Sequence, residues 1–273
     1  MRRLGRATLV VIASVLLGIS AYAGLVKVGL ARNLFAPVAA GDLRLARSDR
    51  HGVRVLFVGN SLTFKNDLPA LVHGLGGRQT PIFAGSFTAP GWQLRQFAGD
   101  HQLDRLLREV RWDVVVLQEQ SQIPSFSTAD RAQEFTPYVQ ELATEVRANG
   151  AQPLLFVTWA HRTGDRRNLS DDTYADMQQR VVDGYWDAAR ASASAVAPVG
   201  VAWAEALTRR PQLGLWASDG THPSRAGSYL AACVFYALLT RTSPVGNRFT
   251  GGLEPSLARF LQRVAWQTAQ KRY

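Results

Sequence analysis

The sequence is poor in cysteine and lacks the residue clusters that mark metal and nucleotide sites. Its single cysteine, Cys233, excludes an internal disulfide framework and a zinc site built from several cysteines. Cys233 lies in an apolar helical run, YLAACVFYALL, so we expect a small buried hydrophobic residue rather than a nucleophile. No His, Asp and Glu residues have the spacing of metal ligands, and no loop has the G-x-G-x-x-G pattern of nucleotide sites. The sequence therefore predicts no metal site and no cofactor.

Lysine is also scarce, which affects what the charge implies. The formal net charge is +10, yet only three of the 31 basic residues are lysines. The arginines are scattered, often beside Asp or Glu, and form no basic helix or stripe of basic and aromatic residues. The charge is compatible with a place near anionic lipid or an acidic polysaccharide, but it does not indicate a nucleic acid partner. Nothing in the sequence indicates an oligomeric state.

The one long hydrophobic run lies at the N-terminus. Residues 1–6, MRRLGR, are positively charged, and residues 7–26 form a stretch of twenty residues without a charge. This stretch is long enough to span a bilayer, and it contains Ala21-Tyr22-Ala23, a small-x-small signature of signal peptidase cleavage. We therefore expect residues 1–30 to be a signal peptide or an N-terminal membrane anchor. The sequence leaves these two alternatives open.

Both alternatives predict export. The protein is expected to be membrane-anchored by its N-terminal helix, or secreted or periplasmic after cleavage. No cysteine directly follows the apolar stretch, which excludes a lipoprotein anchor. Residues 31–52 are predicted to form a linker and residues 53–273 a single folded domain. The content of 47% hydrophobic and 19% charged residues is that of a globular protein.

Beyond the linker, short apolar runs alternate with amphipathic segments of helical length. The apolar runs predict strands over 53–58, 80–85, 112–118, 153–159 and 197–203. The amphipathic segments predict helices over 67–77, 101–110, 130–148, 172–195, 224–240 and 255–270. Strands separated by helices of this length form parallel sheets with helices on both faces. The predicted fold class is therefore α/β, a three-layer α/β/α domain around a five-stranded parallel sheet.

The first predicted strand ends in Gly59-Asn60-Ser61. A serine just past the carboxyl end of a parallel strand lies where open α/β sheets place their ligands. Gly, Asn and Ser are also common in ordinary turns, so this segment alone does not separate a functional serine from a structural one.

A second polar loop, SDGTHPS, follows the last predicted strand and contains Asp219 and His222. A serine hydroxyl is a weak nucleophile unless a base accepts its proton, and that base needs a carboxylate to orient it. Asp219 and His222 supply both groups from one loop, with Pro223 restricting the backbone after the histidine. The alternative is that Asp219 caps the helix beginning near Ser224 and that His222 is an ordinary surface residue.

Taken together, these segments resemble the SGNH hydrolases, also called GDSL esterases and lipases. The resemblance rests on three blocks in the expected order, VLFVGNSLTFKNDLP, WDVVVLQEQSQIP and DGTHPSRAGSYLAA, which look like a bacterial branch of that superfamily. It extends from about Val53 to Leu239. It implies a flavodoxin-like α/β/α fold and a serine esterase with a catalytic triad of Ser61, Asp219 and His222.

The resemblance also implies an oxyanion hole. The superfamily uses the N–H of the nucleophilic serine, here Ser61, a glycine N–H that maps best onto Gly91, and the side-chain amide of an asparagine. The third block of this sequence, LQEQSQ, has no asparagine. Glutamine carries the same amide on a longer side chain, so Gln118 or Gln120 could supply the donor. We favour Gln120, because it lies closest to the position of the asparagine, whereas Gln118 lies at the strand tip.

Weaker expectations concern substrate binding. His161 follows the fourth predicted strand and could line the cleft as a substrate contact. Trp92 lies near a strand end, where an aromatic ring can stack on a sugar, although core packing is the alternative. Asn60, which replaces the usual aspartate of the first block, is a third candidate. Glu119, between the two glutamines, either orients its loop or is exposed to solvent.

The resulting hypothesis is an extracytoplasmic serine esterase that hydrolyses a small acyl ester, such as acetyl on a carbohydrate, through an acyl-enzyme on Ser61. Its expected partner is a small-molecule or carbohydrate ester. Two alternatives stay open. The missing asparagine motivates a non-catalytic module that binds carbohydrate or cell envelope on the same fold, and the sequence does not separate hydrolysis from O-acyl transfer to a sugar hydroxyl.

Overall fold

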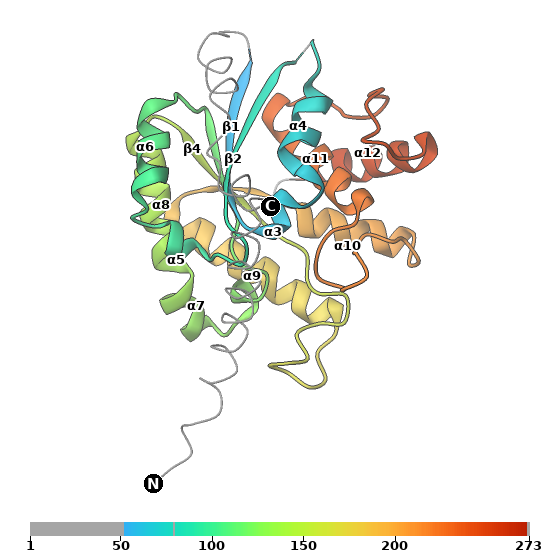
Figure 1. Ribbon diagram of the computed structural model, residues 1–273. Coiled ribbons are helices and arrows are strands. Elements are labelled where there is room, and N and C mark those ends of the chain that lie inside the picture. The colour runs from blue at the N-terminus through green and yellow to red at the C-terminus, as the bar shows by residue number, and fades with distance from the viewer. Residues whose placement is uncertain (1–51, 79, 272–273) are drawn as a thin grey trace, which may run out of the picture. The chain divides into compact units, whose positions relative to one another are not determined.

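The computed structural model describes residues 52–78 and 80–271 (Figure 1). The predicted signal peptide or membrane anchor, residues 1–30, and the predicted linker up to residue 51 lie outside these residues. Within the described part of the chain, no helix has the length and apolar character needed to cross a bilayer.

A five-stranded sheet forms the centre of the described domain. Its strands are β1 (Val53–Gly59), β2 (Ile82–Thr88), β3 (Val114–Leu117), β4 (Gln152–Phe156) and β5 (Ala195–Ala197). They lie in the order β2-β1-β3-β4-β5, and every pair of neighbours is parallel. This order places the carboxyl ends of β1 and β3 side by side at the switch point, where such sheets bind ligands. The predicted α/β fold with a five-stranded parallel sheet is confirmed.

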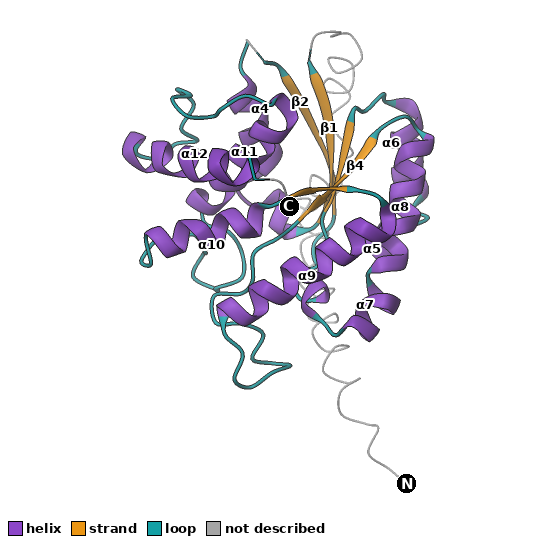
Figure 2. Ribbon diagram, turned by 180° about the vertical axis from the view of Figure 1, so that it is seen from behind, coloured by secondary structure: helices purple, strands orange, loops and turns teal. Residues whose placement is uncertain are grey.

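Helices cover both faces of the sheet, as Figures 1 and 2 show from opposite sides. Successive side chains of β1 enter different cores, because residues of a strand alternate between its two faces: Phe57 belongs to one core and Val58 to the other. The helices of the Phe57 core are α4 (Leu68–Gly76), α10 (Val199–Arg209), α11 (Arg225–Thr240) and α12 (Pro255–Ala269). Those of the Val58 core are α5 (Leu94–Phe97), α6 (His101–Glu109), α8 (Thr136–Ala148) and α9 (Tyr174–Ser192).

Four short helical segments follow β1 and β3. They are α3 (Ser61–Phe64), η2 (Lys65–Asp67), η3 (Ile123–Ser125) and α7 (Thr128–Glu134). The predicted helix over 130–148 is therefore two helices, α7 and α8, which are separated at Phe135 by a non-helical backbone conformation. Pro137 lies in the first turn of α8, where its missing N–H costs no helical hydrogen bond.

The predicted strand over 197–203 is wrong. β5 ends at Ala197 and α10 begins at Val199, so most of this run is helical. A short apolar run does not distinguish a buried strand from a buried helix, and here the helix prevails because it buries Trp203. The ring of Trp203 stacks on Trp159, with centroids 4.1 Å apart, and both side chains are inaccessible to solvent. Both tryptophans therefore serve core packing.

Replacing Trp203 with alanine should lower the free energy of unfolding by about 3–5 kcal/mol, because it removes a fully buried indole and leaves a cavity. The matched control is Leu169→Ala, at a residue that is 50% exposed, which should change the same quantity by less than about 0.5 kcal/mol. Urea denaturation followed by circular dichroism measures both. Similar losses in the two variants would contradict the placement of Trp203 in the core.

Candidate active site

The carboxyl end of β1 leads directly into a turn that begins a helix. Ser61 is the first residue of α3, and Asn60 caps that helix, since its Oδ1 accepts a hydrogen bond from Leu62 N at 3.1 Å. The carbonyl oxygen of Asn60 also accepts from Thr63 N and Phe64 N, at 2.9 and 3.1 Å. These bonds fix the backbone around Ser61. They leave the N–H of Ser61 without an acceptor among the described residues.

Close packing behind this turn requires Gly59. A Cβ atom at this position would lie 2.5 Å from Gln118 Oε1 and 2.9 Å from Thr63 Oγ1. Gln118 Oε1 is held there because it accepts hydrogen bonds from Asn60 N at 2.8 Å and from Thr63 Oγ1 at 2.9 Å. Only glycine leaves room for this bridge between β3 and the turn that carries Ser61.

The loop between α10 and α11 carries Asp219 and His222. Ala217 N donates to His222 O at 2.8 Å and closes the loop. The chain reverses at Gly220, whose φ of +70° is a conformation that glycine adopts without strain.

Residues that follow β4 hold this loop from the side. Trp159 Nε1 donates to Thr221 O at 2.9 Å, and Arg162 N donates to Gly220 O at 2.8 Å. The stacked tryptophan of the core is thus also the anchor of the loop that carries Asp219 and His222.

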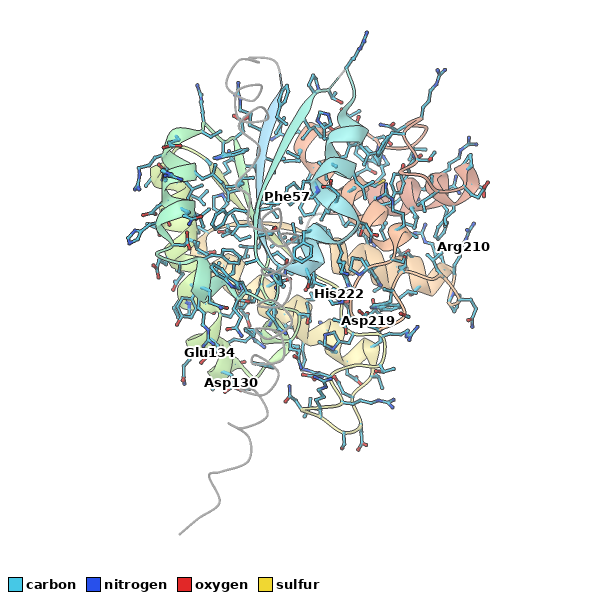
Figure 3. All side chains as sticks on the ribbon, viewed as in Figure 1. Phe57, Asp130, Glu134, Arg210, Asp219 and His222 are labelled. Atoms are coloured by element: carbon cyan, nitrogen blue, oxygen red, sulfur yellow. The ribbon has the colours of Figure 1, made fainter. Side chains whose placement is uncertain are left out.

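Ser61, His222 and Asp219 form a continuous hydrogen-bonded chain. His222 Nε2 lies 2.8 Å from Ser61 Oγ, and His222 Nδ1 lies 2.6 Å from Asp219 Oδ2. Figure 3 labels Asp219 and His222 side by side. The side chain of His222 is 29% exposed, so a substrate can approach it. The structure therefore brings together the three residues that the sequence predicts for a triad.

The carboxylate of Asp219 is held by backbone as well as by His222. Its Oδ1 accepts from Thr221 N and His222 N, both at 2.9 Å. Partial burial raises the pKa of Asp219, but the hydrogen bonds from Thr221 and His222 outweigh burial and lower the pKa to about 2. Asp219 is therefore ionised near neutral pH. The alternative that it caps α11 is wrong, because Ser224 Oγ caps that helix by accepting from Gly227 N at 3.2 Å.

Gly91 lies in the turn after β2, beside the turn that carries Ser61. Its φ is +71°, and a Cβ atom there would meet nothing within 4 Å, so the position faces open space. Asn60 Nδ2 donates to Trp92 O at 2.8 Å and ties the two turns together. No described residue accepts a hydrogen bond from Gly91 N. Gly91 and Ser61 thus each present an unpaired backbone N–H.

The amide of Gln118 is fully occupied. Its Nε2 donates to Asn60 Oδ1 at 2.9 Å and to Glu119 O at 2.5 Å. Because a side-chain amide has only two hydrogens, Gln118 has none left to donate to a substrate. With its oxygen also bonded to the Ser61 turn, the fully buried Gln118 supports that turn from behind.

Gln120 is half-buried and less constrained. Its Oε1 accepts from Gln122 N at 2.8 Å, and its Nε2 donates to Gln122 Oε1 over a longer distance of 3.3 Å. No hydrogen bond joins Gln120 to Ser61 in the described structure. One hydrogen of its amide has no acceptor among the described residues, so Gln120, unlike Gln118, retains a free donor.

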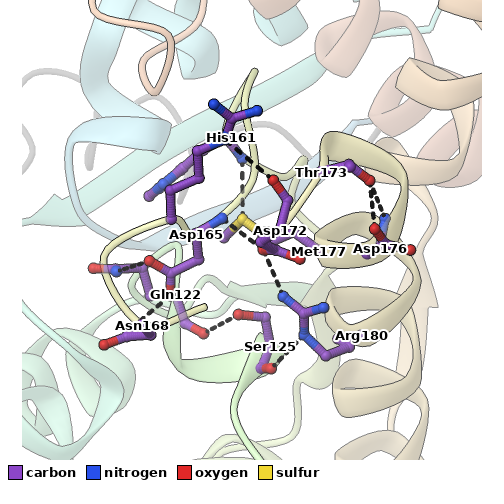
Figure 4. Close-up of polar contacts among 11 residues, drawn as sticks. Gln122, Ser125, His161, Asp165, Asn168, Asp172, Thr173, Asp176, Met177 and Arg180 are labelled. Carbon is purple, nitrogen blue, oxygen red and sulfur yellow. Dashed lines mark hydrogen bonds and ion pairs between the residues drawn. The ribbon is translucent and has the colours of Figure 1, made fainter. Parts of the chain in front are cut away.

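His161 lies in the loop that follows β4 and contacts the loop that follows β3. Its Nε2 lies 2.9 Å from Ser121 Oγ. Its backbone N donates to Met177 Sδ at 3.3 Å, as Figure 4 shows. The next residue, Arg162, donates through N to Gly220 O at 2.8 Å, which places His161 beside the loop that carries His222. Burial lowers the pKa of His161. We therefore expect a neutral imidazole at neutral pH.

A network of polar groups fixes the loop around His161 (Figure 4). Gln122 Nε2 donates to Asp165 Oδ1 at 2.8 Å, and Asp165 N donates to Asp172 Oδ2 at 2.6 Å. Asp172 in turn pairs with Arg180 of α9 at 2.7 Å. The sequence analysis missed this network, because no local motif predicts a bond such as that between Gln122 and Asp165, which are 43 positions apart.

Two residues considered for substrate binding also have structural contacts. Asn60 is 3% exposed, and its side-chain amide caps α3 and bonds to Trp92 and Gln118. The indole of Trp92 packs against Phe97, with ring centroids 5.0 Å apart, as the core-packing alternative predicts, and stays partly exposed.

Within residues 52–78 and 80–271, no group of three or more His, Cys, Asp and Glu side chains could hold a metal ion. Cys233 is buried in α11, and burial raises the pKa of its thiol, so it is the buried apolar residue that the sequence predicts.

The chain matches no protein family model and no curated protein. It does match solved structures. A candidate SGNH hydrolase from Slackia heliotrinireducens is 29% identical, with a TM-score of 0.57, over 70% of this chain and 100% of that chain. The chain has the SGNH hydrolase fold. The resemblance of its three sequence blocks to the SGNH hydrolases is thereby confirmed.

Two further solved structures show the fold alone. A DUF4886 family protein from Bacteroides uniformis is 19% identical, with a TM-score of 0.70, over 80% of this chain and 94% of that chain. A catalytic mutant of an acetylxylan esterase from Geobacillus stearothermophilus is 17% identical, with a TM-score of 0.51, over 67% of this chain and 93% of that chain. In this chain, the residues predicted for the site lie at the carboxyl edge of the sheet.

Gln118 and Gln120 should differ in their effect on stability. Gln118→Ala leaves Asn60 N and the Thr63 hydroxyl buried without partners, so it should lower the free energy of unfolding by about 2–4 kcal/mol. Gln120→Ala is the matched control at a half-buried site and should cost less than about 1 kcal/mol. Urea denaturation of both variants checks this, and the opposite ranking would show that Gln118 does not support the Ser61 turn.

Proposed function

We propose that this protein is a serine hydrolase that cleaves carboxylic esters through an acyl-enzyme on Ser61. One observation carries the proposal: the chain of 2.8 and 2.6 Å hydrogen bonds from Ser61 through His222 to Asp219, within an SGNH hydrolase fold. A serine, a base and an orienting carboxylate in this order activate a hydroxyl for acyl transfer. The neighbour from Slackia heliotrinireducens, itself a candidate SGNH hydrolase, supports the same class.

In the proposed first step, Ser61 Oγ attacks the carbonyl carbon of the ester while His222 Nε2 accepts the hydroxyl proton. Ionised Asp219 orients the imidazole through Nδ1 and stabilises its positive charge. As the tetrahedral intermediate collapses, the bond to the alcohol oxygen breaks and His222 gives its proton to the leaving alcohol. Water then attacks the acyl-enzyme with the same proton transfers, which releases the acid and regenerates Ser61.

The negative oxygen of the intermediate needs donors that point at it before it forms. We assign this role to the backbone N–H groups of Ser61 and Gly91, since neither has an acceptor among the described residues. Gln120 is the proposed side-chain donor in place of asparagine, because it keeps a free amide hydrogen and its bond to Gln122 is long. Gln118, with both amide hydrogens used, does not fit this role.

A small acyl ester on a carbohydrate is the proposed substrate. His161, a neutral imidazole beside the site, suits an uncharged hydroxyl-bearing alcohol better than an anionic one, and the partly exposed ring of Trp92 offers a stacking surface. The fold also occurs in the acetylxylan esterase named above, an enzyme that by its name acts on an acetylated carbohydrate.

We further propose that the domain acts outside the cytoplasm. The support is the sequence of residues 1–26, a positive segment followed by twenty uncharged residues. A location outside the cytoplasm would give the enzyme access to acylated polysaccharides.

A fluorophosphonate probe tests the nucleophile. Wild type should be labelled, Ser61→Ala should not, and His222→Ala should react at least about 10³-fold more slowly because no base activates the hydroxyl.

Gln120→Ala should slow labelling and ester hydrolysis by about 10²–10³, the usual loss when one oxyanion donor is removed. Labelling is measured by intact-protein mass spectrometry, and hydrolysis with 4-nitrophenyl acetate.

His101→Ala, at an exposed histidine of α6, is the matched control and should keep wild-type labelling. Full activity of folded His222→Ala would overturn the triad. A folded wild type that neither labels nor hydrolyses esters would favour the non-catalytic binding module. Acylated sugar, in place of free acid, would identify an acyltransferase.

Cell fractionation tests the proposed location. Full-length protein should appear in the membrane or exported fractions, and a variant lacking residues 1–26 should stay in the cytosol. Mass spectrometry of the mature N-terminus then separates cleavage after Ala23 from an intact anchor. A cytosolic pool of full-length protein would contradict export.

A further inference from the structure

Glu119 is a buried carboxyl group at the edge of the site that the proposed mechanism does not use. It follows β3 by two residues, lies between Gln118 and Gln120, and is completely inaccessible to solvent. The alternative that Glu119 is exposed to solvent is therefore wrong. Among the described residues it forms no ion pair. A buried carboxyl group without a cation is unusual enough to need an explanation.

The contacts of Glu119 join the two loops that carry the proposed oxyanion donors. Leu94 N, three residues after Gly91, donates to both carboxyl oxygens at 3.2 and 3.1 Å. Gln120 N donates to Oε1 at 2.5 Å. One side chain therefore sets the distance between the turn after β2 and the turn after β3. No other side chain of the described residues bonds to both Leu94 N and Gln120 N.

The backbone of Glu119 is fixed as well. Its N–H donates to the hydroxyl of Tyr185 on α9 at 3.0 Å, and its carbonyl oxygen accepts from Gln118 Nε2. Gln118 in turn holds the turn of Ser61. Glu119 is thus linked by hydrogen bonds to the segments that carry all three proposed donors.

The surroundings favour the neutral acid. Burial raises the pKa of Glu119 to about 8, while the hydrogen bonds from Gln120 N and Leu94 N lower it. The charged groups that face it are Arg95 of α5, which lowers the pKa, and Glu134 of α7, which raises it. These two pair with each other at 3.2 Å on the surface, and their effects on the pKa of Glu119 oppose each other. The other titratable neighbour is the neutral Tyr185.

We propose that Glu119 is a positioning residue, which in its neutral form holds the Gly91 and Gln120 turns at the spacing of an oxyanion hole. This inference rests on the proposed function. An ionised carboxylate in this buried place would oppose the negative charge that develops on the substrate oxygen, and its field would be weakly screened. The neutral acid keeps the bridge without that charge, because Oε1 alone accepts from both Leu94 N and Gln120 N. Ionisation of Glu119 should therefore lower the catalytic rate and leave substrate binding nearly unchanged.

The decisive variant is Glu119→Gln, which keeps the shape and the accepting oxygen but does not ionise. With 4-nitrophenyl acetate, wild-type kcat should fall about tenfold between pH 7 and pH 9, as Glu119 loses its proton. Glu119→Gln should keep kcat within about threefold of wild type at pH 7 and should lack the alkaline fall. Glu119→Ala, which removes the bridge, should lose about 10–100-fold in kcat at every pH with KM little changed. Glu109→Gln, at an exposed carboxylate of α6 that is not among the groups shifting the pKa of Glu119, is the matched control and should keep the wild-type profile.

A second measurement is independent of activity. An unfolded chain titrates this carboxyl near its ordinary value of 4.5, so between about pH 4.5 and pH 8 unfolding releases its proton. Stability from the neutral acid is therefore present below about pH 4.5 and is lost as the pH rises to about 8. The Tm of wild type, relative to Glu119→Gln, should fall from pH 5 to pH 8 and then level off. The same trend should appear in a Ser61→Ala background, where no catalysis takes place.

Identical alkaline profiles for wild type and Glu119→Gln would overturn the inference, as would full activity of Glu119→Ala. A difference in Tm that does not change with pH would show that Glu119 is not neutral in the folded protein and would also overturn it. A wild type that neither labels nor hydrolyses esters contradicts the proposed function and with it the catalytic part of the inference. The thermal comparison still decides the charge state of Glu119 in that case.

Discussion

The hydrogen bond of 2.8 Å between His222 Nε2 and Ser61 Oγ joins residues that are 161 positions apart. It forms only if the fold places the two segments that carry these residues side by side. Ser61 is placed by β1, a strand in the interior of the sheet, and by a turn that Asn60 caps and Gln118 supports. His222 is placed by a loop that is hydrogen-bonded to Trp159, which follows β4. A 2.8 Å contact tolerates little relative movement, so both segments need fixed positions.

Direct bonds between the two segments supply part of that constraint. Asn66, the second residue of η2, donates through Nδ2 to Pro223 O at 3.0 Å. Arg225 Nη1 donates to Asn66 O at 2.9 Å. Asn66 has a φ of 56°, a left-handed conformation that asparagine tolerates better than most residues. Both bonds involve residues that closely follow His222, and they hold the start of α11 against the end of the Ser61 segment.

The sequence predicts the parts of the site that local patterns encode. Ser61 follows an apolar strand, and Asp219 and His222 share one loop, so their types and positions could be recognised without a structure. The roles of Gln118 and Gln120 could not be separated in the same way, because counting from a strand end says nothing about which amide is already bonded. The amide hydrogens of Gln118 are taken by Glu119 O and by Asn60 Oδ1, and Asn60 lies 58 positions away.

The same limit explains what the sequence misses. The sequence leaves open whether Glu119 orients its loop or is exposed to solvent, and only its burial and its bond to Leu94, 25 positions earlier, show that it is enclosed. The run over 197–203 is apolar whether it forms a strand or a helix, and its packing on Trp159 decides the outcome. Local sequence thus predicts the order of elements and the reactive side chains, while buried polar contacts between distant segments determine which side chains are free to act.

A crystal structure of the wild-type protein after reaction with a phosphonate ester tests the assignment of the site most directly. The adduct should be covalently bound to Ser61 Oγ, with its charged oxygen about 3 Å from Ser61 N, Gly91 N and Gln120 Nε2. In that complex Gln118 should keep its bonds to Asn60 and Glu119. An adduct on another residue, or an oxygen that points away from Ser61 N and Gly91 N, would contradict the proposed catalytic centre.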